Sequence, residues 1–165
     1  MITTFSTKTD SSCVIDGKNY SCLPLLMTSN EILEVQSDYL RELRVNRGLS
    51  PATVREISKY LRTHVHIMDS YGLSWEQTSE TALRIWRNEQ AGDNPSNSRR
   101  GYLNQQLIAI YRFLIWAEQK GIIQGVVGPL SPSKNTTYLL PVEITRWHKD
   151  GTSAIYKFVR PNCLV

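Results

Sequence analysis

Four segments between residues 28 and 121 each combine a helix start signal with apolar residues spaced three and four positions apart. Before the first segment, Thr28 and Glu31 form a capping-box pattern, in which two side chains satisfy free backbone groups reciprocally. Before the second, Ser50 can cap free amides while Pro51 takes the first helical position, where proline loses no hydrogen bond. This pattern predicts a mainly helical fold. The predicted helices span about residues 30–46, 51–70, 79–90 and 97–120.

The second predicted helix separates an apolar face from a basic one. On its basic side, Arg55, Lys59 and Arg62 lie at positions i, i+4 and i+7, and His66 continues the row. A row of cations one turn apart can follow the phosphates along a groove edge, although a solvated helix face has the same pattern. The opposite side, which we expect to face the core, carries Val54, Ile57, Leu61, Val65 and Met68.

The fourth predicted helix begins with polar residues that suit nucleic acid. Arg99 and Arg100 come first, and Arg side chains bind phosphate or guanine. Asn104 and Gln105 follow, and their amides can bond an adenine edge bidentately. The same composition is also typical of an ordinary polar helix face. The predicted core side of this helix carries Leu103, Leu107, Ile110, Leu114 and Ala117.

Charge alternates along the helical region, although the formal net charge of the chain is only +4. Residues 44–62 hold five Lys or Arg against one Glu, and residues 94–121 hold four against one. Residues 31–43 and 63–93 are net acidic. If the four helices pack together, the second and fourth can share a basic face, which would attract a polyanion rather than a neutral ligand.

Metal, cofactor and membrane functions have little support in the sequence. The three cysteines do not follow metal-ligand spacing, and His64 and His66 point about 200° apart on a helix, so they cannot chelate one ion. The sequence has no Gly-rich phosphate loop and no nucleophile-elbow motif. It also has no apolar run that could cross a membrane and no signal peptide. We therefore expect no cofactor, no metal and an intracellular location.

The two ends of the chain have a different sequence pattern from the helical region. Asp16-Gly17 and Asp150-Gly151 each lie between β-prone runs, which predicts two hairpins. The predicted domain organisation is an N-terminal extension with a hairpin, a self-contained helical domain, a Gly/Pro/Ser linker and a C-terminal hairpin extension. These parts span residues 1–27, 28–124, 125–135 and 136–165, and we expect the two extensions to be dispensable for the helical fold.

Residues 30–124 resemble the core-binding, SAM-like N-terminal domain of tyrosine recombinases, the phage integrase family. The resemblance rests on two sequence motifs, and their order and spacing agree with those of the family over four helices. Gln105 and Gln106 stand where the family often has a basic pair, and Ile57 stands where it often has tyrosine. The motifs are Gly48-Leu49-Ser50-Pro51-Ala52-Thr53, and Asn104-Gln105-Gln106-Leu107 followed by Phe113, Trp116 and Lys120-Gly121-Ile122.

The resemblance implies a four-helix SAM-like core-binding bundle with short flanking β-hairpins, a mainly α fold. In that family, the core-binding domain sits on one face of duplex DNA while a C-terminal catalytic domain grips the other. The family's catalytic set is an Arg, a Lys, a His-x-x-Arg pair and a nucleophilic Tyr, and no His in this chain is followed three residues later by Arg. Tyr138 and Tyr156 are expected to be strand aromatics. We therefore expect no catalytic activity from this chain, and a parent protein that is a tyrosine recombinase.

The resulting hypothesis is the DNA-binding domain of a site-specific recombinase that acts on core sites of a mobile element. Its expected partners are double-stranded DNA, the catalytic domain of the same parent chain and further recombinase protomers, in the nucleoid and away from membranes. The alternatives are a non-catalytic helical protein-interaction adaptor and a stand-alone DNA-binding regulator. The candidate DNA contacts are Ser50, Thr53, Arg55, Lys59, Arg62, Arg99, Arg100, Tyr102, Asn104, Gln105 and Arg112.

Overall fold

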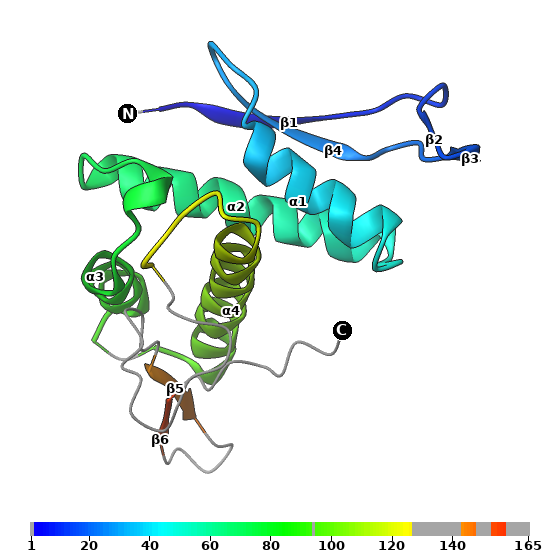
Figure 1. Ribbon diagram of the computed structural model, residues 1–165. Helices are drawn as coiled ribbons and strands as arrows, with labels where there is room; N and C mark the ends of the chain where they lie inside the picture. Colours follow the sequence, from blue (N-terminus) through cyan, green and yellow to red (C-terminus); the bar gives the residue numbers. More distant parts are fainter. Residues whose placement is uncertain (1, 94, 127–142, 148–152, 158–165) are drawn as a thin grey trace. The chain divides into compact units, whose positions relative to one another are not determined.

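The computed structural model describes residues 2–93, 95–126, 143–147 and 153–157 (Figure 1). The chain divides into two compact units, Met1–Trp75 and Glu76–Val165. The first unit contains β1 (Thr4–Lys8), β2 (Val14–Ile15), β3 (Lys18–Asn19), β4 (Pro24–Thr28), α1 (Glu34–Val45) and α2 (Pro51–Ser70). A short 3-10 helix, η1 (Trp75–Gln77), lies at the boundary, and the second unit contains α3 (Glu80–Ala91), α4 (Asn97–Gln119), β5 (Glu143–Trp147) and β6 (Ser153–Lys157).

The N-terminal hairpin is longer than the sequence predicted. The small β2–β3 pair turns at Asp16-Gly17, where both residues have positive φ (49° and 75°), the geometry of a two-residue hairpin turn. This confirms the predicted turn. Outside it, β1 pairs with β4 in antiparallel register from Thr4↔Thr28 to Lys8↔Pro24. The outer pair was not predicted because β1, TFSTK, offers only one apolar residue and no alternating pattern.

The β1–β4 hairpin packs on the helices of the first unit, with β4 contacting α1 and α2 and β1 contacting α2 (Figure 1). Leu26 of β4 is completely buried, its N–H donates to Ser37 Oγ of α1 at 3.0 Å, and its carbonyl accepts from Leu33 at 2.8 Å. These contacts are at odds with the expectation that residues 1–27 are dispensable for the helical fold. The hairpin supplies part of the core of its unit.

Helix α1 begins at Glu34, four residues later than predicted. The Thr28 hydroxyl does accept from the backbone N–H groups of Asn30 and Glu31, at 3.2 and 3.1 Å, as a capping residue would. However, the Thr28 N–H donates to the Glu31 carbonyl at 2.8 Å, which closes a tight turn and leads the chain back along β4. The predicted capping box is therefore wrong, because the same side-chain bonds stabilise a turn.

Helix α2 has the predicted bounds and the predicted cap. The Ser50 hydroxyl accepts from the Thr53 N–H at 3.2 Å, and Pro51 is the first helical residue. The helix ends at Ser70, shortly before Gly72, whose φ of 68° favours glycine. Of the predicted core residues, Val54, Leu61, Val65 and Met68 are buried, whereas Ile57 is half-buried.

In the second unit, Ser79 caps α3 through the Ala82 N–H at 3.1 Å, and Ser96 caps α4 through the Arg99 N–H at 3.2 Å. Strands β5 and β6 pair antiparallel, with Ile144 opposite Tyr156, which confirms the second hairpin. Its predicted turn residues, Asp150 and Gly151, lie outside the described residues, as do Tyr138 and the linker residues 127–135. The predicted core residues of α4, Leu103, Leu107, Ile110, Leu114 and Ala117, are all buried.

The fold is mainly α, with four helices and short flanking strand pairs, as the sequence predicted. Within the described residues, no helix is both long enough and apolar enough to cross a bilayer. The same residues hold no group of three His, Cys, Asp or Glu side chains arranged to bind a metal ion.

Candidate nucleic-acid interface

The basic row of α2 is split between solvent and the N-terminal strand. Arg55 and Lys59 are exposed, whereas Arg62 and His66 are half-buried. Arg62 donates through Nη2 to the Thr4 carbonyl at 2.8 Å and through Nε to the Thr4 hydroxyl at 3.5 Å. The same hydroxyl lies 2.6 Å from His66 Nε2. The C-terminal half of the row therefore contacts β1, and only the N-terminal half faces solvent.

Lys59 has an acidic neighbour. Its ammonium lies 2.8 Å from Glu56 Oε2, and this hydrogen bond holds the pKa of Glu56 below its ordinary value. Glu56, the one acidic residue in segment 44–62, therefore offsets part of the charge of the basic row. The pair is exposed and contributes little to stability, so Lys59 can exchange the carboxylate for another anion at small cost. Arg55 has no side-chain partner among the described residues.

The first turn of α2 lies beside Arg55 and carries two exposed hydroxyls. Ser50 Oγ and Thr53 Oγ1 are 2.9 Å apart, and Ser50 also caps the helix. This turn contains no acidic residue. The start of α2 therefore combines two exposed hydroxyls, the positive end of the helix dipole and one exposed cation, an arrangement that favours a nearby anion.

Arg99 connects the start of α4 to the end of α3. Its Nε donates to the Gln90 carbonyl and its Nη2 to Gln90 Oε1, both at 3.1 Å. A cation is favourable there because the carbonyl end of a helix carries partial negative charge. The sequence had assigned Arg99 to phosphate, and the structure gives it protein acceptors.

The polar residues of α4 that were predicted to contact DNA are divided between two faces. Arg100 and Asn104, one turn apart, are half-buried on one face. Tyr102, Gln105 and Arg112 are exposed on another. Successive residues on a helix point about 100° apart, which is why Asn104 and Gln105 separate. The sequence identified these residues, but it did not show that they form two surfaces.

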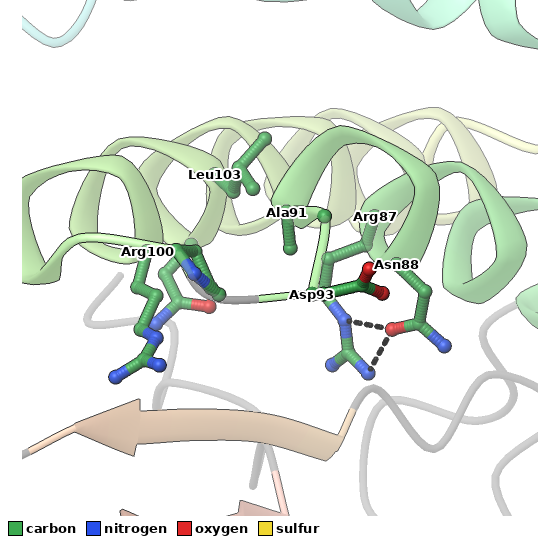
Figure 2. Close-up of a pocket in the computed structure, with 9 residues that line it drawn as sticks. Arg87, Asn88, Ala91, Asp93, Arg100 and Leu103 are labelled. Carbon is green, nitrogen blue, oxygen red and sulfur yellow. Dashed lines mark hydrogen bonds between the residues drawn. The ribbon is translucent and has the colours of Figure 1, made fainter.

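The face with Arg100 and Asn104 borders a cavity of ≈270 Å³ within the second unit (Figure 2). Sequence reasoning missed the residues that α3 contributes, because they lie in a net acidic segment and Asp93 belongs to a run interpreted as a loop. The sequence did offer one indication of this site, because that loop directly precedes the capped start of α4. The lining consists of Arg87, Asn88, Ala91, Gly92, Asp93, Pro95, Arg100, Leu103 and Asn104.

His64 and His66 have different environments, as their spacing predicted. His64 is completely buried, and desolvation lowers its pKa to about 3, so the ring is neutral. His66 instead contacts Thr4 at the edge of β1. His64 therefore belongs to the core, and no described cluster joins either ring to further metal ligands.

Among the described residues, the chain has four helices, three of which begin with a serine cap, together with short flanking hairpins. Exposed cations lie on α2 and on α4. Residues 37–121 match the family model described as the phage integrase, N-terminal SAM-like domain. This match covers just over half of the chain, and the chain belongs to the phage integrase family. Comparison with curated proteins and with solved structures found no match.

Proposed function

We propose that this chain is the DNA-binding part of a site-specific tyrosine recombinase, which holds duplex DNA at core sites during integration and recombination. The family supports the proposal, because its SAM-like domain occurs in recombinases that act on DNA. The observation that carries it is that three candidate DNA contacts are exposed and have no side-chain partner among the described residues. These side chains are Arg55 on α2, and Gln105 and Arg112 on α4.

The proposed roles follow from exposure and chemistry. Arg55, Lys59 and Arg112 contact phosphates, and Ser50, Thr53 and Tyr102 donate hydroxyl hydrogen bonds to the DNA backbone. Gln105 contacts a base edge, because its amide can both donate and accept. Arg62 and Arg99 already donate to protein acceptors, so we expect them to contribute less to DNA affinity than Arg55 does.

Strand cleavage is proposed to come from a catalytic domain of the same parent protein and not from these residues, since the sequence has no His-x-x-Arg pair. The proposed partners are accordingly duplex DNA, that catalytic domain and other recombinase protomers assembled on one DNA. The nucleoid is the proposed location.

Replacing Arg55 or Lys59 by Ala should weaken duplex binding about equally on every DNA sequence. Removing one phosphate interaction should lower the slope of log K against log salt by about 0.9, because fewer counterions are released on binding. Fluorescence anisotropy at several salt concentrations, on specific and random duplexes, measures both quantities. Arg41→Ala is the matched control, since Arg41 is an exposed cation paired with Asp38 at 2.8 Å on α1. If the Arg55 and Lys59 variants bind like the parent, the row is a solvated face and a protein-interaction adaptor is favoured.

Gln105→Ala should reduce discrimination between DNA sequences rather than overall affinity. A bidentate contact to a base contributes about 1–3 kcal/mol of preference for the correct base. The difference in binding free energy between the selected site and random duplex, the specificity gap, should therefore narrow by that amount. The selected site comes from enrichment of a random duplex library on the parent protein. Gln119→Ala, an exposed glutamine at the end of the same helix, should leave the gap unchanged. An unchanged gap in Gln105→Ala would remove this residue from the base-reading surface.

A further inference from the structure

The cavity in the second unit has polar groups of two kinds around an apolar base. It lies where the last turns of α3, the following loop and the first turns of α4 meet. In Figure 2, Leu103 and Ala91 lie between the two helices, and the guanidinium groups of Arg87 and Arg100 lie to either side of them. The cavity is therefore cationic at two ends and apolar between them.

The arginines and asparagines of the lining are suited to different parts of a ligand. Arg87 and Arg100 present planar guanidinium groups, which match phosphate oxygens in a bidentate geometry. Asn88 and Asn104 present carboxamides, which can donate and accept on a base edge. Asn88 is held in place, because its Oδ1 accepts from Arg87 Nε and Nη2 at 3.3 and 3.1 Å.

The apolar base argues against a bare anion as the occupant. Leu103 is buried to 2% exposure, and Ala91 and Pro95 continue the apolar surface, which suits the face of a sugar or a base. Asp93 is the only carboxylate among the described residues of the lining. It disfavours a bare phosphate, but it can accept from an amino group or a sugar hydroxyl. The volume of ≈270 Å³ is close to the lower limit, about 300 Å³, of small-ligand sites.

We propose that this cavity binds one unpaired nucleotide, with its phosphate at one of the two guanidinium groups, its base edge at the asparagines and its sugar or base face over Leu103. The proposal rests on the proposed function, since it gives the DNA-binding domain a second recognition mode beyond duplex phosphates. The same nucleoside monophosphate unit can come from an extrahelical position in DNA or from a free nucleotide. The cost of unstacking is smallest for a base that is already unpaired.

The first experiment titrates the full chain with each deoxynucleoside 5′-monophosphate, with inorganic phosphate and with the deoxynucleosides, and follows backbone amide shifts by NMR. At least one nucleotide should shift amides between residues 87 and 104, and inorganic phosphate should bind roughly tenfold more weakly, because it makes none of the base-edge hydrogen bonds. Equal binding of nucleotide and phosphate, or no shift in this range, overturns the proposal.

The second experiment compares a duplex that has one unpaired nucleotide with the fully paired duplex of otherwise identical sequence. The parent chain should bind the bulged duplex roughly tenfold more tightly. Arg100→Gln and Asn104→Ala should abolish that preference, and thermal unfolding of each variant establishes that it is folded. Arg84→Gln removes the same charge from α3 at an exposed position outside the lining, and it should retain the preference.

The two experiments distinguish a failure of the cavity proposal from a failure of the duplex-binding proposal. If paired and bulged duplexes bind equally and free nucleotides cause no shifts, the cavity proposal is wrong while duplex binding stands. If a nucleotide binds at residues 87–104 but no duplex binds, the duplex-binding function is wrong and the cavity is a site for free nucleotides.

Discussion

Replacing Leu26 by Ala is expected to lower the free energy of unfolding by about 2–5 kcal/mol, the range for a leucine removed from a packed core. Leu26 lies in β4, is completely buried, and has both backbone groups bonded, one to Ser37 of α1 and one to Leu33. The substitution leaves these backbone bonds intact and creates a cavity between the hairpin and the helices. Urea denaturation followed by circular dichroism at the helical signal measures the change.

Val14→Ala is the matched control, because Val14 belongs to the small β2–β3 pair and is 60% exposed. Its expected effect is within about 0.5 kcal/mol, as for most exposed substitutions. A Leu26→Ala protein as stable as Val14→Ala would mean that the hairpin does not stabilise the helices. In that case residues 28–124 would fold without the N-terminal extension.

The helix starts show why much of the fold could be predicted. Caps such as Ser50 act on backbone groups three residues away, and proline at position 51 fixes its own backbone angle. These are local effects that a sequence displays directly. Thr28 shows the limit of the same reasoning, because its hydroxyl makes cap-like bonds in a turn. The chain instead returns along β4, where the Leu33 N–H donates to the carbonyl of the buried Leu26, a contact that the local pattern does not display.

The candidate site was less predictable than the helices, because some of its cations bond to protein groups that are distant in the sequence. Arg62 bonds to Thr4, which lies 58 positions earlier in the chain, in a strand with no strong sequence signal. Arg99 bonds to Gln90 across a loop. Helical spacing placed Arg55, Lys59 and Arg62 correctly on one face, but spacing carries no information about which of them another element covers. Periodicity therefore predicts the surroundings of a residue such as Arg55, which no other element covers, but not those of Arg62.

His64 should make the protein less stable as the pH falls from about 7.5 to about 5. Burial lowers the pKa of His64 in the folded state to about 3, while the unfolded chain has the ordinary value of 6.5. Between these two values the unfolded state binds a proton that the folded state does not bind, so acid favours unfolding. The contribution of His64 is fully present above pH 6.5 and is lost progressively as the pH falls below it. At about pH 5 the loss is about 2 kcal/mol from this one residue.

Urea denaturation of the parent and of His64→Gln at several pH values tests this prediction. Gln cannot be protonated in this range, so the substitution should remove most of the dependence of the unfolding free energy on pH. His66→Gln is the matched control, since it changes the other histidine of α2 and leaves the buried one in place. Glu56 does not obscure the result, because its pKa lies below the ordinary 4.5 and it takes up its proton at lower pH. If His64→Gln keeps the pH dependence of the parent, the buried ring is not its source and the prediction is wrong.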